Sequence, residues 1–326
     1  MSTSELEPEF EALLAHLKQN CVCDLTGYKR ASLMRQFQRR MQQLKIENYR
    51  DYLEYLQGHA EEFTRLLDTV WINVSSFFRD HDAWDYLADN IIPLIIIKKQ
   101  PHERIRVWST GCATGEEVYT LAMLLAESLG REQYLQRVQI LATDIDEDAI
   151  AQARQGSYGD KELAAIPNEL RSKYFEKTDQ SHAFCRQLRR TIIFGRHDLA
   201  VDAPMSKIDL LVCRNVLIYF QPETQATILV RFHFALTNKG FLFLGNSESF
   251  FNSRRTFNSV NLKYRIFAKG QNLSLEEHLL IKPQTANKKS VDPLTTQFHI
   301  WQIAFETSPY ALIYLWLTNK LTPCLV

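Results

Sequence analysis

The chain has 326 residues, which is too long for one compact domain and long enough for two. Apolar residues make up 45% of it and charged residues 23%, so it can bury a sizeable core and has the composition of an ordinary globular protein. Lysine plus arginine and aspartate plus glutamate both total 38, a balance that gives no overall charge to attract nucleic acid or a membrane surface. We therefore expect no nucleic-acid partner, and any basic patch has to be local.

Six cysteines are scattered along the sequence, and only Cys21 and Cys23 lie close together. No second pair of metal ligands accompanies them, so we expect reduced thiols in a cytoplasmic protein and no metal site. The longest apolar run, Ile91–Ile97, is far shorter than the roughly 20 residues that span a bilayer. The acidic N-terminus also lacks the apolar core of a signal peptide. These features predict a soluble protein without membrane insertion.

The first part of the chain has the apolar periodicity of helices. Leu13 and Leu17 recur at helical spacing, and so do Leu33 and Phe37. No strand pattern occurs before residue 100. We therefore predict an all-helical domain over residues 1–89.

One of these predicted helices has a basic face. Arg35 and Arg39 lie four residues apart, opposite the apolar stripe of the helix, and Arg40 lies at the edge of that stripe. The arginines form either a solvated face or a docking surface for an acidic partner. The spacing alone does not decide between these two interpretations.

From Ile105 onward, short apolar β-rich runs alternate with helical patterns. The expected strands are Ile105–Ser109, Val138–Thr143, Ile208–Cys213, Phe241–Gly245 and Tyr264–Ala268, and the expected helices are Glu116–Leu129 and Thr224–Leu236. This alternation indicates an α/β fold with a largely parallel sheet that is covered by helices on both faces. Between the second and third strands, the polar stretch Gln155–Arg196 contains one β-like run, Thr191–Phe194. We interpret this stretch as helices plus a small strand insertion.

The C-terminal part departs from this pattern. Residues 270–297 are polar and aperiodic, which is typical of a linker. Residues 298–326 regain apolar character but are too few to fold alone. We predict a linker followed by an incomplete domain.

A glycine-containing loop follows the first expected strand and precedes a helix, which is the position of ligands at the carboxyl edge of a parallel sheet. Its glycines, Gly111 and Gly115, have the spacing G-x-x-x-G rather than the G-x-G-x-x-G of a dinucleotide site. The next residues, Glu116 and Glu117, would repel a pyrophosphate but suit a ligand that carries an ammonium and a sulfonium. A simpler interpretation is that both glutamates only favour the helix N-terminus.

Polar residues also follow the other expected strands. Asp144 ends the second strand, where a carboxylate can accept hydrogen bonds from both hydroxyls of a ribose. Its alternative role is a helix N-cap, which Asp146 fits better. Arg214 and Asn215 follow the third strand, and Asp198 would add a fourth polar loop. All of these residues are expected at one edge of the sheet.

A further polar and aromatic stretch, Asn73–Arg79, precedes the sheet. It places Phe77 and Phe78 beside a polar N-x-S sequence and an arginine, which is unusual for a plain surface loop. The two phenylalanines alternatively form an apolar staple between the two domains.

Together these stretches resemble the CheR family of chemotaxis receptor methyltransferases in both order and spacing. The motifs that carry the resemblance lie at Asn73–Arg79, Arg106–Thr120, Asp144–Asp146, Cys213–Phe220 and Gly245–Glu248, and the resemblance covers roughly residues 10–269. It implies a Rossmann-like class I methyltransferase domain over residues 90–269, with a small β-subdomain inserted at about 172–197. The helical domain over residues 1–89 would precede it and dock on the receptor.

The resemblance also implies roles for individual residues. Residues expected to contact the cofactor S-adenosyl-L-methionine (SAM) are Asn73, Ser75, Arg79, Glu117, Asp144, Asp198, Leu199, Arg214 and Asn215. Arg79 and Tyr219 would be the catalytic pair nearest the transferred methyl group. The basic helix with Arg35, Arg39 and Arg40 would dock on the methylation helices of the receptor.

Two segments depart from the family pattern. In some members the β-subdomain, expected here near Cys185–Phe194, grips a short peptide at the C-terminus of a receptor with the help of a glycine-containing loop. The matching stretch Thr178–Ala183 is short and lacks glycine, which argues against tethered binding. The segment Phe305–Ile313 resembles the opening of a PAS sensor domain, but too few residues follow it to complete one.

The expected reaction is transfer of a methyl group to glutamate carboxylates of a methyl-accepting receptor or receptor-like protein, with S-adenosyl-L-homocysteine as the second product. A glutamate in water has a pKa of about 4.3, so it is already a nucleophile at neutral pH and needs no general base. We expect the enzyme to act as a monomer. Two alternatives are a catalytically silent signalling scaffold of the same fold and an NAD-dependent oxidoreductase.

Overall fold

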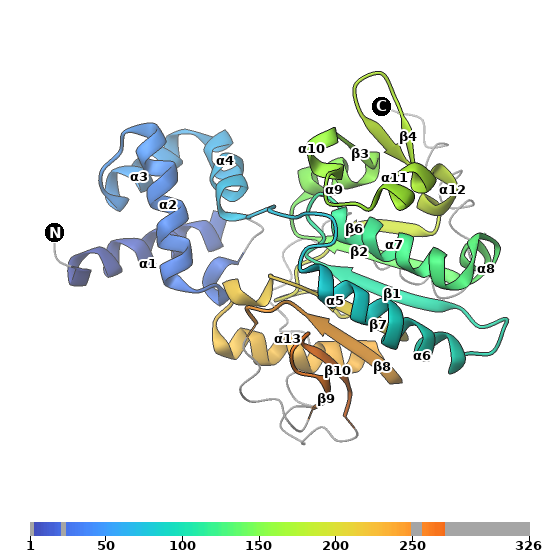
Figure 1. Ribbon diagram of the computed structural model, residues 1–326. Helices are drawn as coiled ribbons and strands as arrows, with labels where there is room; N and C mark the ends of the chain where they lie inside the picture. The colour runs from blue at the N-terminus through green and yellow to red at the C-terminus, as the bar shows by residue number, and fades with distance from the viewer. Residues whose placement is uncertain (1–2, 21–23, 249–255, 271–326) are drawn as a thin grey trace, which may run out of the picture. The chain divides into compact units, whose positions relative to one another are not determined.

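A computed structural model describes residues 3–20, 24–248 and 256–270 (Figure 1). The predicted PAS-like segment and nearly all of the predicted linker lie outside these residues, as do Cys21 and Cys23. None of the described helices combines the length and the apolar character needed to cross a bilayer.

From residue 105 onward the chain contains a seven-stranded sheet with the strand order β6-β2-β1-β7-β8-β10-β9. Its strands are β1 (Ile105–Thr110), β2 (Val138–Asp144), β6 (Ile192–Arg196), β7 (Ile208–Cys213), β8 (Leu236–Leu244), β9 (Phe257–Asn261) and β10 (Ile266–Lys269). The first five strands in this order run parallel, and β10 runs antiparallel to both of its neighbours. The order reverses between β1 and β7, which is where open α/β sheets bind ligands. The predicted α/β class is confirmed.

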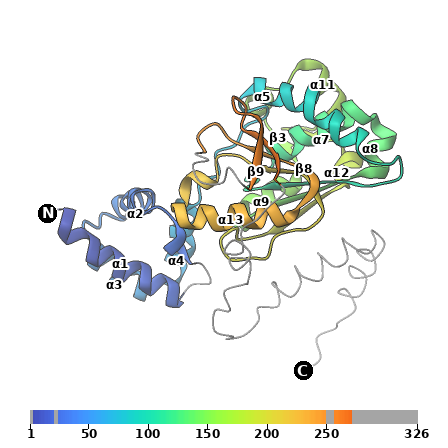
Figure 2. The same cartoon turned by 90° about the horizontal axis from the view of Figure 1, so that it is seen from below.

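Apolar side chains cover both faces of the sheet, which is why its central strands read as continuous apolar runs. Every residue of β1 and of β7 is buried. Val107 faces a core that it shares with helix α7 (Glu116–Leu129). Trp108 points to the opposite face and contacts Phe232 of helix α13 (Pro222–Ala235) edge-on, with ring centroids 5.9 Å apart. Figure 2 shows α13 on the side of the sheet opposite α7.

The helices form two groups along the chain. The N-terminal group consists of α1 (Thr3–Asn20), the 3-10 turn η1 (Leu25–Gly27), α2 (Arg30–Leu44), α3 (Tyr49–Gly58) and α4 (Ala60–Val70). The group that belongs with the sheet consists of α5 (His81–Tyr86), the π-helical turn η2 (Leu87–Ile91), α6 (Ile92–Ile97), α7 (Glu116–Leu129), α8 (Arg131–Arg137), α9 (Glu147–Gln155), α10 (Asp160–Leu163), α11 (Asn168–Tyr174), α12 (Arg186–Arg189), the 3-10 turn η3 (Leu217–Tyr219) and α13 (Pro222–Ala235).

The structure places the change of domain earlier than the predicted boundary at Asp89. Trp84, Ile91 and Ile95 belong to the core on one face of the sheet, and the Trp84 ring lies 5.2 Å from Phe243 of β8. The helices from His81 to Ile97 are therefore part of the sheet domain. Helical periodicity shows that a segment is helical but does not show which core its apolar face joins. The prediction therefore placed the end of the helical domain too late in the chain.

The small β insertion also lies elsewhere than predicted. A three-stranded antiparallel sheet with the order β3-β5-β4 is formed by β3 (Ser157–Tyr158), β4 (Phe175–Lys177) and β5 (His182–Phe184). We assigned the run Thr191–Phe194 to the insertion, but its residues Ile192–Phe194 lie in β6 and pair in parallel with β2 of the main sheet. The insertion thus spans 157–184 rather than 172–197. A short apolar run indicates a strand, but its pairing partner is set by packing.

Phe77 and Phe78 are both buried in the core of the sheet domain. The Phe77 ring contacts Tyr158 and Phe175 of the small sheet edge-on, with centroids 4.9 and 5.7 Å away. The alternative interpretation of these residues as an apolar staple between the two domains is therefore wrong. They anchor the stretch that carries Arg79 to the sheet domain.

The three arginines predicted for docking are not equivalent. Arg35 and Arg39 are exposed on α2, whereas Arg40 forms two hydrogen bonds with Glu62 of α4, at 2.7 and 2.6 Å. Tyr52 donates a third hydrogen bond to Glu62, whose side chain is only 1% exposed. Burial alone raises the pKa of Glu62, but the hydrogen bonds from Arg40 and Tyr52 outweigh it and hold this pKa below its usual value. Arg40 therefore joins α2 to α4 and does not extend the exposed basic face.

Replacing Arg40 by alanine should destabilise the helical domain by about 3 kcal/mol, because it leaves a buried carboxylate without its cation. Replacing the adjacent, exposed Arg39 should change stability by less than about 0.5 kcal/mol. Because the folded pKa of Glu62 is depressed, the stabilisation is present above the unfolded pKa and is lost as the pH falls through the folded pKa. Urea unfolding of both variants at neutral and at acidic pH measures this, and equal losses at neutral pH would contradict the assignment.

Candidate active site

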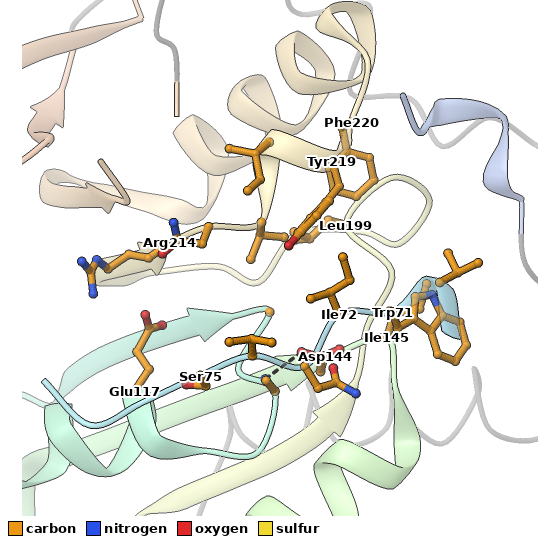
Figure 3. A pocket seen from close by; sticks show the side chains of 18 of the residues that line it. Trp71, Ile72, Ser75, Glu117, Asp144, Ile145, Leu199, Arg214, Tyr219 and Phe220 are labelled. Carbon is orange, nitrogen blue, oxygen red and sulfur yellow. Dashed lines mark hydrogen bonds between the residues drawn. The ribbon is translucent and has the colours of Figure 1, made fainter. Parts of the chain in front are cut away.

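A pocket lies at the carboxyl edge of β1, β2, β6 and β7, where the strand order reverses. All ten residues predicted to contact the cofactor or to be catalytic line this one pocket, namely Asn73, Ser75, Arg79, Glu117, Asp144, Asp198, Leu199, Arg214, Asn215 and Tyr219. Figure 3 shows Glu117 and Arg214 facing each other at one end, Asp144 in the middle and Trp71 at the far end. Residues that are far apart in the sequence thus converge on one elongated cavity.

The loop after β1 forms the floor of the pocket. Gly111 adopts a positive φ of 67°, and a Cβ atom there would lie 2.3 Å from Cγ2 of Val216 in the loop after β7. Only glycine accommodates both the backbone conformation and this close approach. The amide of Ala113 donates a 2.8 Å hydrogen bond to Asp144, which joins the loop to the end of β2.

The sequence left open whether Asp144 faces the ligand or caps the following helix, and the structure shows that Asp146 is the cap. Asp146 is the N-cap of α9 and accepts hydrogen bonds from the amides of Asp148 and Ala149. Asp144 accepts one backbone hydrogen bond on each carboxylate oxygen, and burial raises its pKa. The remaining lone pairs of Asp144 are available to the pocket. The N-cap interpretation is correct for Asp146 and wrong for Asp144.

Glu117 and Arg214 form the end of the pocket beside α7. Glu117 accepts a 2.8 Å hydrogen bond from Ser109, and burial raises the pKa of Glu117 to about 7 although Arg214 opposes this shift. Glu116, by contrast, is hydrogen-bonded to Thr114 and does not line the pocket. A carboxyl group with such a pKa gains from a cationic ligand, which would hold it in its ionised form.

Arg214 fixes the stretch that carries Arg79. Its Nη1 donates to the carbonyl of Arg79 at 2.9 Å and its Nη2 to the Asp80 carboxylate at 2.6 Å. The guanidinium, with a side chain that is 2% exposed, also lies over the rings of Trp84 and Phe243. The role of Arg214 that the structure describes is therefore to hold this loop at the rim of the pocket.

The stretch before the sheet contributes one wall of the pocket. Asn73 donates a hydrogen bond to Asp146, which attaches this stretch to the loop after β2. The Arg79 guanidinium donates to the carbonyl of Val74 at 3.2 Å, and its remaining N–H groups are available at the rim. Trp71, the last labelled residue at the far end, also lines the pocket and was not predicted from the sequence.

The loop after β7 forms the opposite wall. Asn215 has a positive φ of 61°, and its Oδ1 is buried without a hydrogen-bond partner among the described residues. Tyr219 lies across the pocket from Asp144 (Figure 3). Burial raises the pKa of the Tyr219 phenol, while the nearby guanidinium groups of Arg79 and Arg35 lower it, so both arginines lie in its electrostatic environment.

The loop after β6 completes the site with Asp198 and Leu199. Burial raises the pKa of Asp198, which accepts a 2.8 Å hydrogen bond from the amide of Ala200. The Leu199 carbonyl accepts a hydrogen bond from Arg231 of α13 at 2.9 Å, which fixes the backbone of this loop.

Glu248 organises the loop after β7 and had no role in the sequence interpretation. It is 2% exposed and accepts hydrogen bonds from the amides of Val216 at 2.8 Å and Leu217 at 3.2 Å. Its second carboxylate oxygen accepts from the amide of Gly245. The sequence signal for it was the late G-x-S-E motif, to whose glutamate we assigned no function. Among the described residues no cluster of three His, Cys, Asp or Glu side chains is arranged to hold a metal ion.

Two family models match the chain in succession. The CheR methyltransferase all-alpha domain matches residues 8–70, and the CheR methyltransferase SAM binding domain matches residues 73–266. The junction between the two matches falls directly after α4, where the structure also changes from the helical domain to the sheet domain.

Curated relatives support the same assignment. The chemotaxis protein methyltransferase of Listeria innocua is 32% identical over 249 residues, which cover 76% of this chain and 92% of the relative. That of Escherichia coli is 32% identical over 248 residues, or 72% of this chain and 81% of the relative. An uncharacterized 104.1 kDa protein of Rhodobacter capsulatus is 35% identical over 240 residues, and here the match covers 74% of this chain but only 25% of the relative.

The shifted pKa of Glu117 gives a testable prediction for the protein without ligand. Its folded pKa of about 7 lies above the ordinary glutamate value of 4.5, so the stabilising contribution of this group is complete below pH 4.5 and is lost as the pH rises through 7. Replacing Glu117 by glutamine should remove this loss. We expect the variant to gain about 2–3 kcal/mol relative to wild type between pH 5 and pH 8. Denaturant unfolding across this range measures the difference, and parallel pH curves would contradict it.

The residues that line the pocket fit SAM. Asp144 has free lone pairs for ribose hydroxyls, Glu117 suits the ammonium group at one end, and the unpartnered Oδ1 of Asn215 offers a further acceptor. The family matches extend over nearly all of the described residues. The chain therefore belongs to the CheR methyltransferase family, and its sheet domain is the SAM-binding domain of that family.

Proposed function

We propose that this protein transfers a methyl group from SAM to glutamate side chains of a chemoreceptor or a receptor-like protein, giving glutamyl methyl esters. The observation that carries the proposal is the position of Arg79 and Tyr219. Both lie at the same pocket as Glu117 and Asp144, but they offer hydrogen-bond donors where the other two offer carboxylates. The names of the relatives in Listeria innocua and Escherichia coli, chemotaxis protein methyltransferases, support a receptor as the acceptor.

When bound, SAM supplies a methyl group on a positively charged sulfonium, from which a carboxylate oxygen can displace S-adenosyl-L-homocysteine. The acceptor glutamate, with an ordinary pKa of about 4.3, is ionised at neutral pH, so no residue has to remove a proton. The reaction therefore does not need His197, which lines the pocket, as a base. The ring of His197 is hydrogen-bonded to the carbonyl of Ala203. The task left to the protein is to position the acceptor and to exclude water, which can contribute on the order of 7–11 kcal/mol.

Arg79 and Tyr219 are proposed to position the acceptor. The free N–H groups of Arg79 can bind the incoming carboxylate through charge-assisted hydrogen bonds. Burial raises the pKa of Tyr219, so its phenol stays protonated at neutral pH and can donate a hydrogen bond to the same carboxylate. These contacts would leave one lone pair of that carboxylate free to attack the methyl group of SAM.

The proposed acceptor surface includes Arg35 and Arg39, which are exposed on α2. Tyr28, Ser32 and Leu33, at the start of the same helical segment, line the pocket. An acidic helix on this surface would therefore present its glutamate next to the pocket. We propose that the enzyme acts in this way in the cytoplasm, as a monomer and without a metal ion, on receptor segments that reach it there.

The two alternative functions make different predictions. An NAD-dependent oxidoreductase needs a pyrophosphate site, which the acidic pocket end at Glu117 opposes. A silent scaffold of the same fold would bind receptor without transferring methyl groups. Incubation with methyl-labelled SAM and receptor-containing membranes distinguishes them. Base-labile label on a receptor band supports the proposal, and absence of label with every receptor fraction that binds the protein would favour the scaffold.

Replacing Arg79 by alanine should lower kcat by about 100-fold, because the charged contact to the carboxylate is lost. Replacing Tyr219 by phenylalanine removes one hydrogen bond and should lower kcat by about 10-fold. The matched controls are Arg50→Ala and Tyr55→Phe; Arg50 is exposed and Tyr55 partly buried on α3, and neither lines the pocket. Steady-state kinetics with saturating SAM give kcat, and calorimetry gives the Kd for S-adenosyl-L-homocysteine. Loss of activity that only reflects weaker cofactor binding would contradict the proposed role of the pair.

A further inference from the structure

The helical domain and the loop of Tyr219 are joined by paired main chains. The amide of Lys29 donates to the carbonyl of Tyr219 at 2.8 Å, and the amide of Gln221 donates to the carbonyl of Gly27 at 2.9 Å. Between these two bonds Tyr28 and Phe220 form an antiparallel β-bridge. We call the paired segments Gly27–Lys29 and Tyr219–Gln221 the main-chain bridge.

The bridge connects elements with different tasks. Lys29 is the N-cap residue of α2, the helix that carries Arg35 and Arg39. On the other side, Tyr219 is the last residue of η3, and Gln221 is the N-cap residue of α13. The bridge therefore joins the start of the proposed docking helix directly to the backbone of a proposed catalytic residue.

Side chains reinforce the bridge and shield it from water. The rings of Tyr28 and Phe220 are both buried, with centroids 4.6 Å apart. A Cβ on Gly27 would lie 3.0 Å from Oγ1 of Thr224, so Gly27 is also in close contact with the first turn of α13. Backbone hydrogen bonds in such surroundings are stronger than in water, and losing one is costly.

The loop of Tyr219 is held at both of its ends. Glu248 binds the amides of Val216 and Leu217 at the start of η3, and the bridge holds the carbonyl of Tyr219 at its end. The phenol ring also lies in the electrostatic environment of Arg35 of α2. A displacement of the N-terminus of α2 would therefore move the end of η3 and its tyrosine.

We infer that the main-chain N–H of Lys29 is a positioning group for Tyr219, so that the docking helix sets the place of the catalytic phenol. This inference rests on the proposed function. It adds that the backbone of Gly27–Lys29 aligns an acceptor bound on α2 with Tyr219. Lys29 acts through Tyr219 and touches neither the acceptor nor SAM.

The backbone conformation of Lys29 allows a sharp test. Its φ of −61° and ψ of 123°, and the extended conformation of Tyr28 before it, are those that proline and its preceding residue adopt. Lys29→Pro therefore fits the chain locally but removes the N–H and puts the proline Cδ where the Tyr219 carbonyl now accepts. Lys29→Ala loses the same side chain and charge but keeps the N–H, so the two variants differ at the contact with the Tyr219 carbonyl, which proline breaks both by removing the donor and by crowding the oxygen.

The measurement compares methyl transfer by full-length wild type and by these two variants, together with calorimetry of S-adenosyl-L-homocysteine binding. We expect kcat of Lys29→Pro to be at least 10-fold below that of Lys29→Ala, with Kd values within about threefold of each other. Equal kcat values for the two variants would overturn the inference. If wild type transfers no methyl group to any receptor fraction, the proposed function fails instead, and the two failures are distinct.

If Lys29→Pro does not fold, a second pair of variants tests whether the main-chain bridge positions Tyr219. Gly27→Ala should press on Thr224 and lower kcat several-fold, while Thr224→Ala removes the contacting atoms and should restore kcat in the double variant. Restoration of kcat with unchanged ligand affinity supports the bridge as a positioning device. A single Gly27→Ala variant with wild-type kcat, or a double variant without recovery, would count against it.

Discussion

The site depends on the close contact between the loops that follow β1 and β7. These strands are parallel neighbours, so both loops leave the same edge of the sheet, and Gly111 leaves room for Val216 where any side chain would collide. The contact positions Asn215 beside the floor of the pocket and sets where η3 begins. Glu248 fixes the loop from the other side by binding its backbone amides. The contact thus sets how the residues proposed to bind SAM and those proposed to position the acceptor lie relative to each other.

Charge is distributed unevenly around the pocket. Burial raises the pKa of three carboxyl groups along it, those of Glu117, Asp144 and Asp198, because little water reaches them. Such groups suit a ligand with a cationic end and hydroxyl donors. The same pocket is also lined by Arg79, whose guanidinium suits an anionic acceptor. This combination of buried carboxyl groups and a rim guanidinium fits the proposal that the pocket receives a cationic methyl donor and a carboxylate acceptor.

The sequence was enough to predict that the polar residues after the strands come together. Residues that follow buried parallel strands must meet at one edge of the sheet, as Asp144 and Asn215 do. It did not predict which core a segment joins, since Trp84 lies in a helix of the same periodicity as those of the helical domain. It likewise assigned the run Thr191–Phe194 to the small insertion, whereas Ile192–Phe194 pair with β2 of the main sheet, because pairing partners leave no local signal. The role of Glu248 was missed because its hydrogen bonds go to backbone amides, which every residue type except proline provides.

The most direct test of this account is a crystal structure of the protein with S-adenosyl-L-homocysteine. The account predicts that the ligand lies along the pocket with its ribose hydroxyls on Asp144 and its amino group next to Glu117, and that its sulfur faces Tyr219. A ligand bound with its ribose away from Asp144, or with its sulfur turned from Tyr219, would contradict the central claim. The same crystals would show whether the carbonyl of Tyr219 keeps its bond to Lys29 when the site is occupied.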